Sequence, residues 1–256
     1  MESGAGGAIT GNRQANWSFA EAYGAAGATR PAQSASPVGP SGPAAAPPAA
    51  GATTSAAAPE RATVATALLW ARQRARETGV TATSDGTGAA LRLLAAAADA
   101  KAVVEIGTGT GVSGLQLLQG MRPDGVLTTM DPDPELQQFA RQAFQAAGFA
   151  PNRARIIAGR ALDVLPRLAD GGYDMVFADG DPWESVEYFA ESLRLLRTGG
   201  LVCFAGVFAE GRTVDPAVHR GEVLKLRELL RTVKESQILL PALLPVGDGL
   251  LCAIKR

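Results

Sequence analysis

The stretch that most constrains the fold lies at residues 103–111, which read Val-Val-Glu-Ile-Gly-Thr-Gly-Thr-Gly. Its apolar run holds one acid, Glu105, and glycine then occupies every second position from Gly107. A second apolar run, 126–130, ends at Asp131. This order of features is typical of a nucleoside-binding site: a buried strand, then a glycine turn, then an acid about twenty residues further on. In such a site the backbone of the glycine turn comes close to the cofactor. Glycine lacks the Cβ that would block this approach, and a carboxylate can accept hydrogen bonds from ribose hydroxyls.

Composition narrows the class of protein further. The chain has 256 residues, of which 46% are hydrophobic, and a formal net charge of −1, so it lacks the basic excess of a nucleic-acid-binding protein. Cys203, Cys252 and the single histidine, His219, have no zinc-ligand spacing. The sequence shows neither an apolar run of membrane-spanning length nor a signal-peptide pattern. We therefore expect a soluble cytoplasmic protein with no nucleic-acid or membrane partner.

The composition changes near residue 62. Residues 24–59 are almost wholly Ala, Pro, Gly, Ser and Thr, which bury too little apolar surface to offset backbone entropy. We predict that the N-terminal segment 1–62 is largely disordered. Within it, Trp17, Phe19 and Tyr23 lie close together. They either dock on the folded body or a partner, or belong to a fraying terminus.

Residues 63–256 have the pattern of one folded domain. Two helices come first, 64–78 and 89–98, with a loop at 81–88 between them. Strands are then predicted at 102–107, 126–131, 153–158, 174–179 and 200–205, and helices at 113–121, 133–147, 161–168 and 183–196. Crossovers of this length form right-handed βαβ units, which require a parallel sheet covered on both faces.

The C-terminal part departs from a plain dinucleotide-binding fold. A helix at 220–234 carries interleaved acids and bases, which predict a solvated face. Two apolar runs follow, 237–244 and 250–254, joined by a short turn that predicts an antiparallel hairpin. The predicted fold class is α/β, a doubly wound Rossmann-like sheet of seven strands, mostly parallel, with a C-terminal antiparallel hairpin.

The glycine loop fits two cofactors. Residues 109–114 match G-x-G-x-x-G, so an NAD-dependent oxidoreductase has to be considered. S-adenosylmethionine (SAM) is favoured by the acid at Glu105, by glycines that begin at Gly107, and by the terminal hairpin.

The order of these motifs also resembles that of a known enzyme family. Residues 63–256 resemble the class I SAM-dependent O-methyltransferases of the catechol and caffeoyl-CoA type, in their bacterial branch. The matching landmarks run in order at 104–113, 128–131, 159–166, 173–181, 211–212 and 244–250. The resemblance implies O-methylation of a small phenolic or catechol-like acceptor. It also implies a homodimer, because relatives are commonly dimers.

The resemblance implies roles for individual residues. The methionine part of SAM would be held by Glu105, Gly107, Thr108, Gly109, Gly111 and Ser113. Asp131 would bind the ribose, and Arg160 and Ala161 would border the adenine. The family usually has an acid where Arg160 stands, so the chain departs from the pattern there. The loop 81–87 is expected to pass over the cofactor, and Asp179 to border it as the candidate catalytic residue.

The family's metal site is degraded in this sequence. The resemblance implies a divalent metal on the acid that ends the fourth strand, Asp179, and on an Asp-Asn pair that ends the fifth. Ala205 and Gly206 replace that pair, and Pro182 stands where a lysine often follows. We therefore predict no metal of the family type, with substitute ligands at Asp181 and Glu210 as a weaker alternative.

Three functions stay open. The first is a SAM-dependent O-methyltransferase without the family's metal site. The second is a SAM-binding protein that has lost turnover and acts by interaction, which the missing ligands favour. The third is an NAD-dependent oxidoreductase.

Overall fold

A seven-stranded sheet forms the centre of the protein, whose computed structural model describes residues 14–23 and 57–256. The strand order is β3-β2-β1-β4-β5-β7-β6. The first five strands are parallel, and β7 is antiparallel to both of its neighbours, β5 and β6. The strands are β1 (Ala102–Ile106), β2 (Val126–Asp131), β3 (Ala154–Ala158), β4 (Tyr173–Ala178), β5 (Leu196–Ala205), β6 (Leu239–Leu244) and β7 (Leu250–Lys255). This topology confirms the fold class predicted from the sequence.

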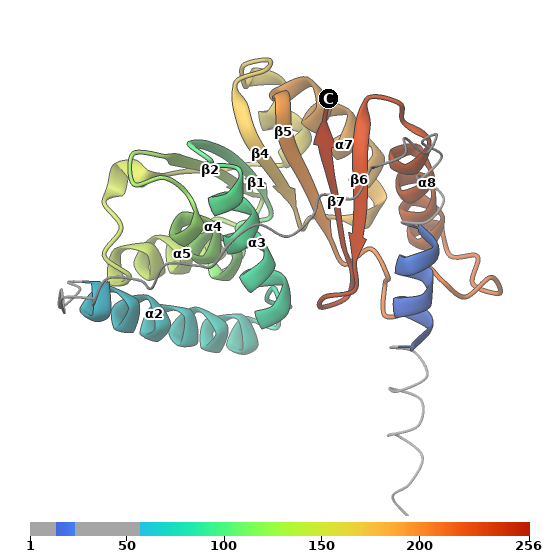
Figure 1. Cartoon of the computed structure of the whole chain (residues 1–256). Helices are drawn as coiled ribbons and strands as arrows, with labels where there is room; N and C mark the ends of the chain where they lie inside the picture. Colours follow the sequence, from blue (N-terminus) through green and yellow to red (C-terminus); the bar gives the residue numbers. More distant parts are fainter. Residues whose placement is uncertain (1–13, 24–56) are drawn as a thin grey trace, which may run out of the picture.

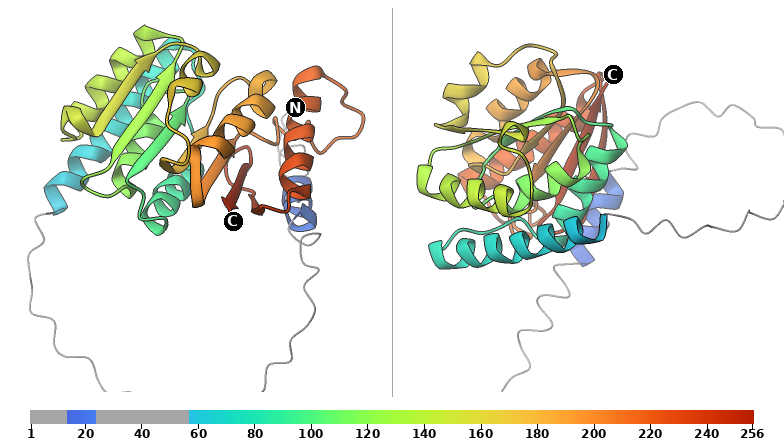
Figure 2. Two further views of the ribbon diagram at one scale, coloured as in Figure 1. Left: turned by 90° about the horizontal axis from the view of Figure 1, so that it is seen from above. Right: turned by 90° about the vertical axis from the view of Figure 1, so that its left-hand side faces the viewer.

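Helices cover both faces of the sheet (Figures 1 and 2). Four pack on one face: α2 (Ala57–Thr78), α3 (Asp85–Ala97), α4 (Val112–Gly120) and α5 (Pro134–Ala146). Those on the other face are α6 (Ala161–Val164), α7 (Ser185–Leu195) and α8 (Gly221–Glu235). Short 3₁₀ turns occupy Pro151–Arg153, Leu165–Arg167 and Pro182–Glu184. None of the helices in the described part of the chain is long and apolar enough to cross a membrane.

The two cores follow from the alternation of side chains along each strand. In β1, Val103 packs toward α2–α5, whereas Val104 and Ile106 pack toward α6–α8. Glu105 alternates with Val104, so its carboxylate lies on the same side of the sheet as Val103 and α4. The sequence pattern therefore decides which layer each strand residue joins.

Several predicted boundaries were wrong, including the start of the first helix, the end of the loop after it and the start of the fifth strand. The first helix begins at Ala57, not at residue 64, so residues 57–62 of the segment 1–62, predicted to be largely disordered, are helical. Residues 1–13 and 24–56 of that segment lie outside the described residues. The predicted loop 81–88 ends at Ser84, whose hydroxyl accepts a hydrogen bond from the Thr87 backbone N–H and caps α3. β5 begins at Leu196 rather than at residue 200. Leu196 already pairs with Tyr173 of β4, and after a shift in register the pairing resumes at Leu201, which lies opposite Met175.

The aromatic N-terminal segment forms a helix, residues 14–23, that docks beside α8 (Figure 1). Ala20 and Tyr23 are buried, and the Tyr23 hydroxyl donates to the carbonyl oxygen of Leu230 at 2.9 Å. The Phe19 ring meets Phe208 edge-on at a centroid distance of 6.4 Å. The structure therefore shows that this segment docks on the folded body, which is one of the alternatives that the sequence left open.

Candidate cofactor site and active site

The site lies where the strand order reverses, between β1 and β4. In an open α/β sheet this switch point leaves a crevice outside the carboxyl ends of the strands. Backbone hydrogen bonds connect the strand ends at this point. The Gly107 N–H donates to the Met130 carbonyl at 2.9 Å, and the Asp179 N–H donates to the Ile106 carbonyl at 2.9 Å. The ends of three neighbouring strands are thus fixed relative to one another.

The glycine turn after β1 is shaped by close contacts. Gly107 has φ +93°, and a Cβ there would lie 2.5 Å from the carbonyl oxygen of Asp179. Gly111 has φ +91°, and its Cβ would lie 2.9 Å from Cα of Ala140 on α5. Gly109 also has a positive φ, +49°, but nothing lies within 4 Å of the Cβ position. Gly107 and Gly111 therefore allow close packing, while Gly109 faces open space.

Threonine hydroxyls fix the turn from both sides. Thr108 and Thr129 share a hydrogen bond of 2.7 Å between their Oγ1 atoms, and both residues are buried. Gln137 on α5 donates to Thr108 at 3.3 Å. Thr110 donates to the Ala71 carbonyl on α2 at 2.9 Å. These bonds preorganise the turn against the helices around it.

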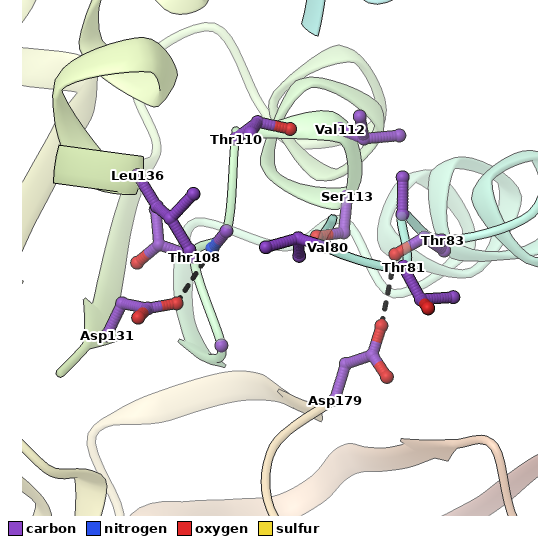
Figure 3. Close-up of a pocket in the computed structure, with 13 residues that line it drawn as sticks. Val80, Thr81, Thr83, Thr108, Thr110, Val112, Ser113, Asp131, Leu136 and Asp179 are labelled. Carbon is purple, nitrogen blue, oxygen red and sulfur yellow. Dashed lines mark hydrogen bonds between the residues drawn. The ribbon is translucent and has the colours of Figure 1, made fainter. Parts of the chain in front are cut away.

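Asp131 is held against the glycine turn (Figure 3). One carboxylate oxygen accepts from the Gly109 N–H at 2.8 Å, and the other accepts from the Asp133 N–H at 2.9 Å. The cap of α5 is Asp133 rather than Asp131, since the Asp133 side chain accepts from the Glu135 and Leu136 N–H groups. Each Asp131 oxygen keeps a further lone pair for a donor in the crevice.

Glu105 is a buried carboxylate without a hydrogen-bond partner among the described residues. Its side chain is fully buried, and neither oxygen makes a hydrogen bond within the described part of the chain. Burial raises its pKa to about 7; the nearby hydroxyls of Thr129 and Ser113 oppose this rise, and the charges of Asp179 and Asp131 add to it. A buried carboxylate is costly to ionise, which is why the pKa of Glu105 lies well above its ordinary value of 4.5.

Asp179 follows the end of β4 and points toward the loop before α3 (Figure 3). Its carboxylate accepts a hydrogen bond from the Thr83 hydroxyl at 3.2 Å. Asp179 is exposed at the mouth of the crevice, yet the protein packed around it raises its pKa by desolvation, and the hydrogen bond from Thr83 partly opposes the rise. The sequence did not single out Thr83 as a partner, because the two residues are 96 positions apart.

Two adjoining pockets meet at Gly107, Asp131 and Asp179. The smaller has a volume of about 100 Å³, and the larger about 440 Å³. The smaller is lined by residues 80–83, 107–110, 112–113, Asp131, Leu136 and Asp179. The larger is lined by Ile106, Gly107, residues 130–132, Arg160, Ala161, residues 179–181, Glu184 and Tyr188. Their junction suits a ligand with a short polar end and a longer planar end.

Most of the predicted cofactor residues line these pockets. Gly107, Thr108, Gly109, Ser113, Asp131 and Asp179 line the smaller one, and Arg160 and Ala161 line the larger. Glu105 and Gly111 line neither: Glu105 lies behind the turn, where its Oε2 would be 3.1 Å from a Cβ on Gly114.

A network that the sequence analysis missed borders the larger pocket. The exposed Arg160 side chain forms an ion pair with Glu184, and the Tyr188 hydroxyl donates to Glu184 at 2.6 Å. Burial and the neighbouring Glu184 raise the pKa of Tyr188, so its phenol keeps its proton. The only available sequence signal was the spacing of four residues between Glu184 and Tyr188, which places them on one side of a helix.

The residues present do not fit the metal site that the resemblance implies. The β4–β5 register pairs Ala178 with Phe204, so Ala205 falls beside Asp179 and supplies no oxygen ligand from its side chain. Asp181 is used locally, because its side chain accepts from the Trp183 N–H and caps a 3₁₀ turn. Within residues 14–23 and 57–256, no group of three or more His, Cys, Asp or Glu side chains could hold a metal ion. The metal-free site remains a prediction.

The strand order, the antiparallel last strand and the glycine turn followed by Asp131 define a Rossmann-like methyltransferase fold. Residues 62–256 match the O-methyltransferase family, and the chain belongs to that family. A Mycobacterium tuberculosis protein named as a probable O-methyltransferase is 47% identical over 188 residues, which cover 73% of this chain and 84% of that protein.

Solved structures share this fold, and one of the two described next is an O-methyltransferase. A Corynebacterium glutamicum protein superposes with a TM-score of 0.70 at 30% identity, covering 75% of this chain and 90% of that one. The O-methyltransferase TomG of Streptomyces achromogenes, which is involved in tomaymycin synthesis, was crystallised with SAM. It superposes with a TM-score of 0.69 at 30% identity, covering 74% of this chain and 89% of TomG.

Proposed function

We propose that this protein transfers a methyl group from SAM to an oxygen atom of a small acceptor, and that it does so without the family's metal site. The observation that carries the proposal is the pair of joined pockets around Asp131, whose carboxylate is fixed by hydrogen bonds from the Gly109 and Asp133 N–H groups. Membership of the O-methyltransferase family and the SAM complex of TomG support the same cofactor.

The pocket residues match the chemistry of SAM part by part. Asp131 offers lone pairs for the two ribose hydroxyls. Ser113, near the N-terminus of α4, would meet the methionine carboxylate. The larger pocket has the volume for the adenosine part, with Ala161 and Arg160 along its wall. Glu105 lies behind the turn and lines neither pocket; because its pKa is about 7, a cationic cofactor nearby would favour its ionised form.

SAM, when bound, supplies a methyl group on a sulfonium sulfur, and the neutral thioether that the methyl group leaves behind is a good leaving group. The chain's own task is to align the acceptor oxygen and to remove its proton. Asp179 is the candidate general base: it borders both pockets, Thr83 orients it, and its raised pKa makes it a better proton acceptor than an ordinary aspartate.

Turnover tests the proposal. Labelled SAM is incubated with a panel of phenols and catechols, after EDTA treatment and with added Mg²⁺. We expect methylation that EDTA does not abolish. Asp179→Asn should lower kcat by about 100-fold or more while leaving the Kd for SAM within a few-fold. Asp170→Asn is the control, because it removes an exposed surface carboxylate that contacts neither pocket.

Other outcomes would support the alternatives. Strong Mg²⁺ dependence that Asp179→Ala abolishes would show that a metal acts in this site after all. Micromolar SAM binding with no turnover on any acceptor would favour a non-catalytic SAM-binding protein, the function that Ala205 and Gly206 favour. If NAD raised the melting temperature at a tenfold lower concentration than SAM does, that result would contradict the proposed cofactor.

A further inference from the structure

A third cavity lies between the N-terminal helix and α8, apart from the cofactor site. Its volume is about 590 Å³, within the range of small-molecule sites. It is lined by Phe19, Tyr23, Thr213, Arg227, Leu230, Arg231, Lys234 and Glu235. None of these residues lines either pocket of the cofactor site.

One side of the cavity is apolar and rigid. Phe19, Tyr23 and Leu230 supply it. The Tyr23 ring is held in place by burial and by its hydrogen bond to the Leu230 carbonyl. The Phe19 ring is held by its edge-on contact with Phe208. These two rings and Leu230 form an apolar wall against which a flat ligand can pack.

The other side carries unbalanced positive charge. Arg227, Arg231 and Lys234 outnumber the single acid, Glu235, and none of the three bases forms an ion pair with a described carboxylate. The Arg227 guanidinium donates to four backbone carbonyls between residues 212 and 218, which fixes the loop that carries Thr213. The Lys234 ammonium lies 5.4 Å from the centroid of the Tyr23 ring.

Thr213 adds an unsatisfied polar group to the wall. The residue is 3% exposed, and its hydroxyl has no hydrogen-bond partner among the described residues. Buried hydroxyl groups in folded proteins are generally hydrogen-bonded, often to ordered water, so Thr213 adds a polar group to an otherwise mixed wall.

We propose that this cavity binds a small organic anion with a flat apolar body, such as an aromatic carboxylate or sulfonate. The body packs against the wall formed by Phe19, Tyr23 and Leu230, and the anionic group lies between Arg231 and Lys234. The match to the O-methyltransferase family begins at residue 62, so the helix that forms half of this site lies outside the matched region. The proposal does not depend on methyl transfer.

Fluorescent probes test the site on the full-length protein. 8-Anilinonaphthalene-1-sulfonate is an aromatic anion, and N-phenyl-1-naphthylamine is nearly the same molecule without the sulfonate. We expect saturable binding of one sulfonate probe per chain that S-adenosylhomocysteine does not displace. The double variant Arg231→Gln/Lys234→Gln should weaken binding of the sulfonate by at least about tenfold, and binding of the neutral probe little.

Two further variants separate this site from general effects of charge and folding. Arg220→Gln/Lys225→Gln removes the same net charge from residues that do not line the cavity, and should leave the sulfonate affinity unchanged. Phe19→Ala should weaken both probes, because it removes part of the apolar wall. The proposal is overturned if the Arg231→Gln/Lys234→Gln protein binds the sulfonate as tightly as the parent, or if S-adenosylhomocysteine displaces it.

Discussion

Gly107 and Gly109 belong to the same turn but differ in what surrounds their Cβ positions, so the turn can be tested one residue at a time. Gly107→Ala forces a methyl group against the Asp179 carbonyl at a positive φ, and we expect it to lower the free energy of unfolding by about 2 kcal/mol or more. Gly109→Ala meets open space and should cost about 1 kcal/mol. Urea denaturation of the cofactor-free proteins measures both. Equal losses would contradict this account of the turn.

Glu105 predicts a pH dependence of stability. Its pKa is about 7 in the folded protein, against an ordinary value of 4.5, so between these values the folded state holds a proton that the unfolded state has lost. Stability should therefore fall as pH rises from about 4.5 to 7, by about 3 kcal/mol from this group, and then level off.

The variant Glu105→Gln isolates this contribution, because an amide does not titrate. We expect the cofactor-free variant to be more stable than the parent at pH 8, with little difference at pH 4.5, and to bind SAM more weakly. Denaturant unfolding at the two pH values, with calorimetric titration of SAM, measures these effects. A stability difference that does not change with pH would show that Glu105 has an ordinary pKa.

At the scale of elements, the start of α3 was the clearest error of the sequence analysis. In the sequence, Gly86 and Gly88 favour a loop. In the structure Gly88 lies inside α3 and packs closely against α4, where a Cβ would come within 2.9 Å of the Gln116 side chain. Helix packing against α4 outweighs the poor helix propensity of glycine. The consequence is functional: the short segment before α3 places Thr83 against Asp179.

The cap of α3 can be tested directly. Ser84→Ala removes the hydroxyl that accepts from the Thr87 N–H, and we expect it to lower the free energy of unfolding by about 1 kcal/mol. Ser236→Ala is the control: Ser236 follows the end of α8 and makes no side-chain cap. Equal, small effects of both substitutions in urea denaturation would show that the cap contributes nothing.

At the scale of the whole molecule, the strand order predicts where the sheet is most stable. β1, β4 and β5 lie in the middle of the sheet, whereas β3 and β6 are its edges. In hydrogen-exchange mass spectrometry we expect the amides of β1 and β4 to exchange most slowly, and those of β3 to exchange fastest among the parallel strands. β3 also buries its side chains incompletely. Protection of β3 equal to that of β4 would contradict this ordering.

The sequence by itself determined the fold class, the glycine turn and the position of Asp131 after the second strand. These features depend on local periodicity and on glycine's freedom at positive φ, which a short stretch of residues records. The tertiary structure alone decided the contact of Thr83 with Asp179, the Arg160–Glu184–Tyr188 network and the docking of the N-terminal helix on α8. The Thr83–Asp179 and N-terminal contacts join residues far apart in the chain. The spacing of Glu184 and Tyr188 is a local signal, but it does not show that Arg160 joins them. All three features depend on how side chains pack once the layers have formed.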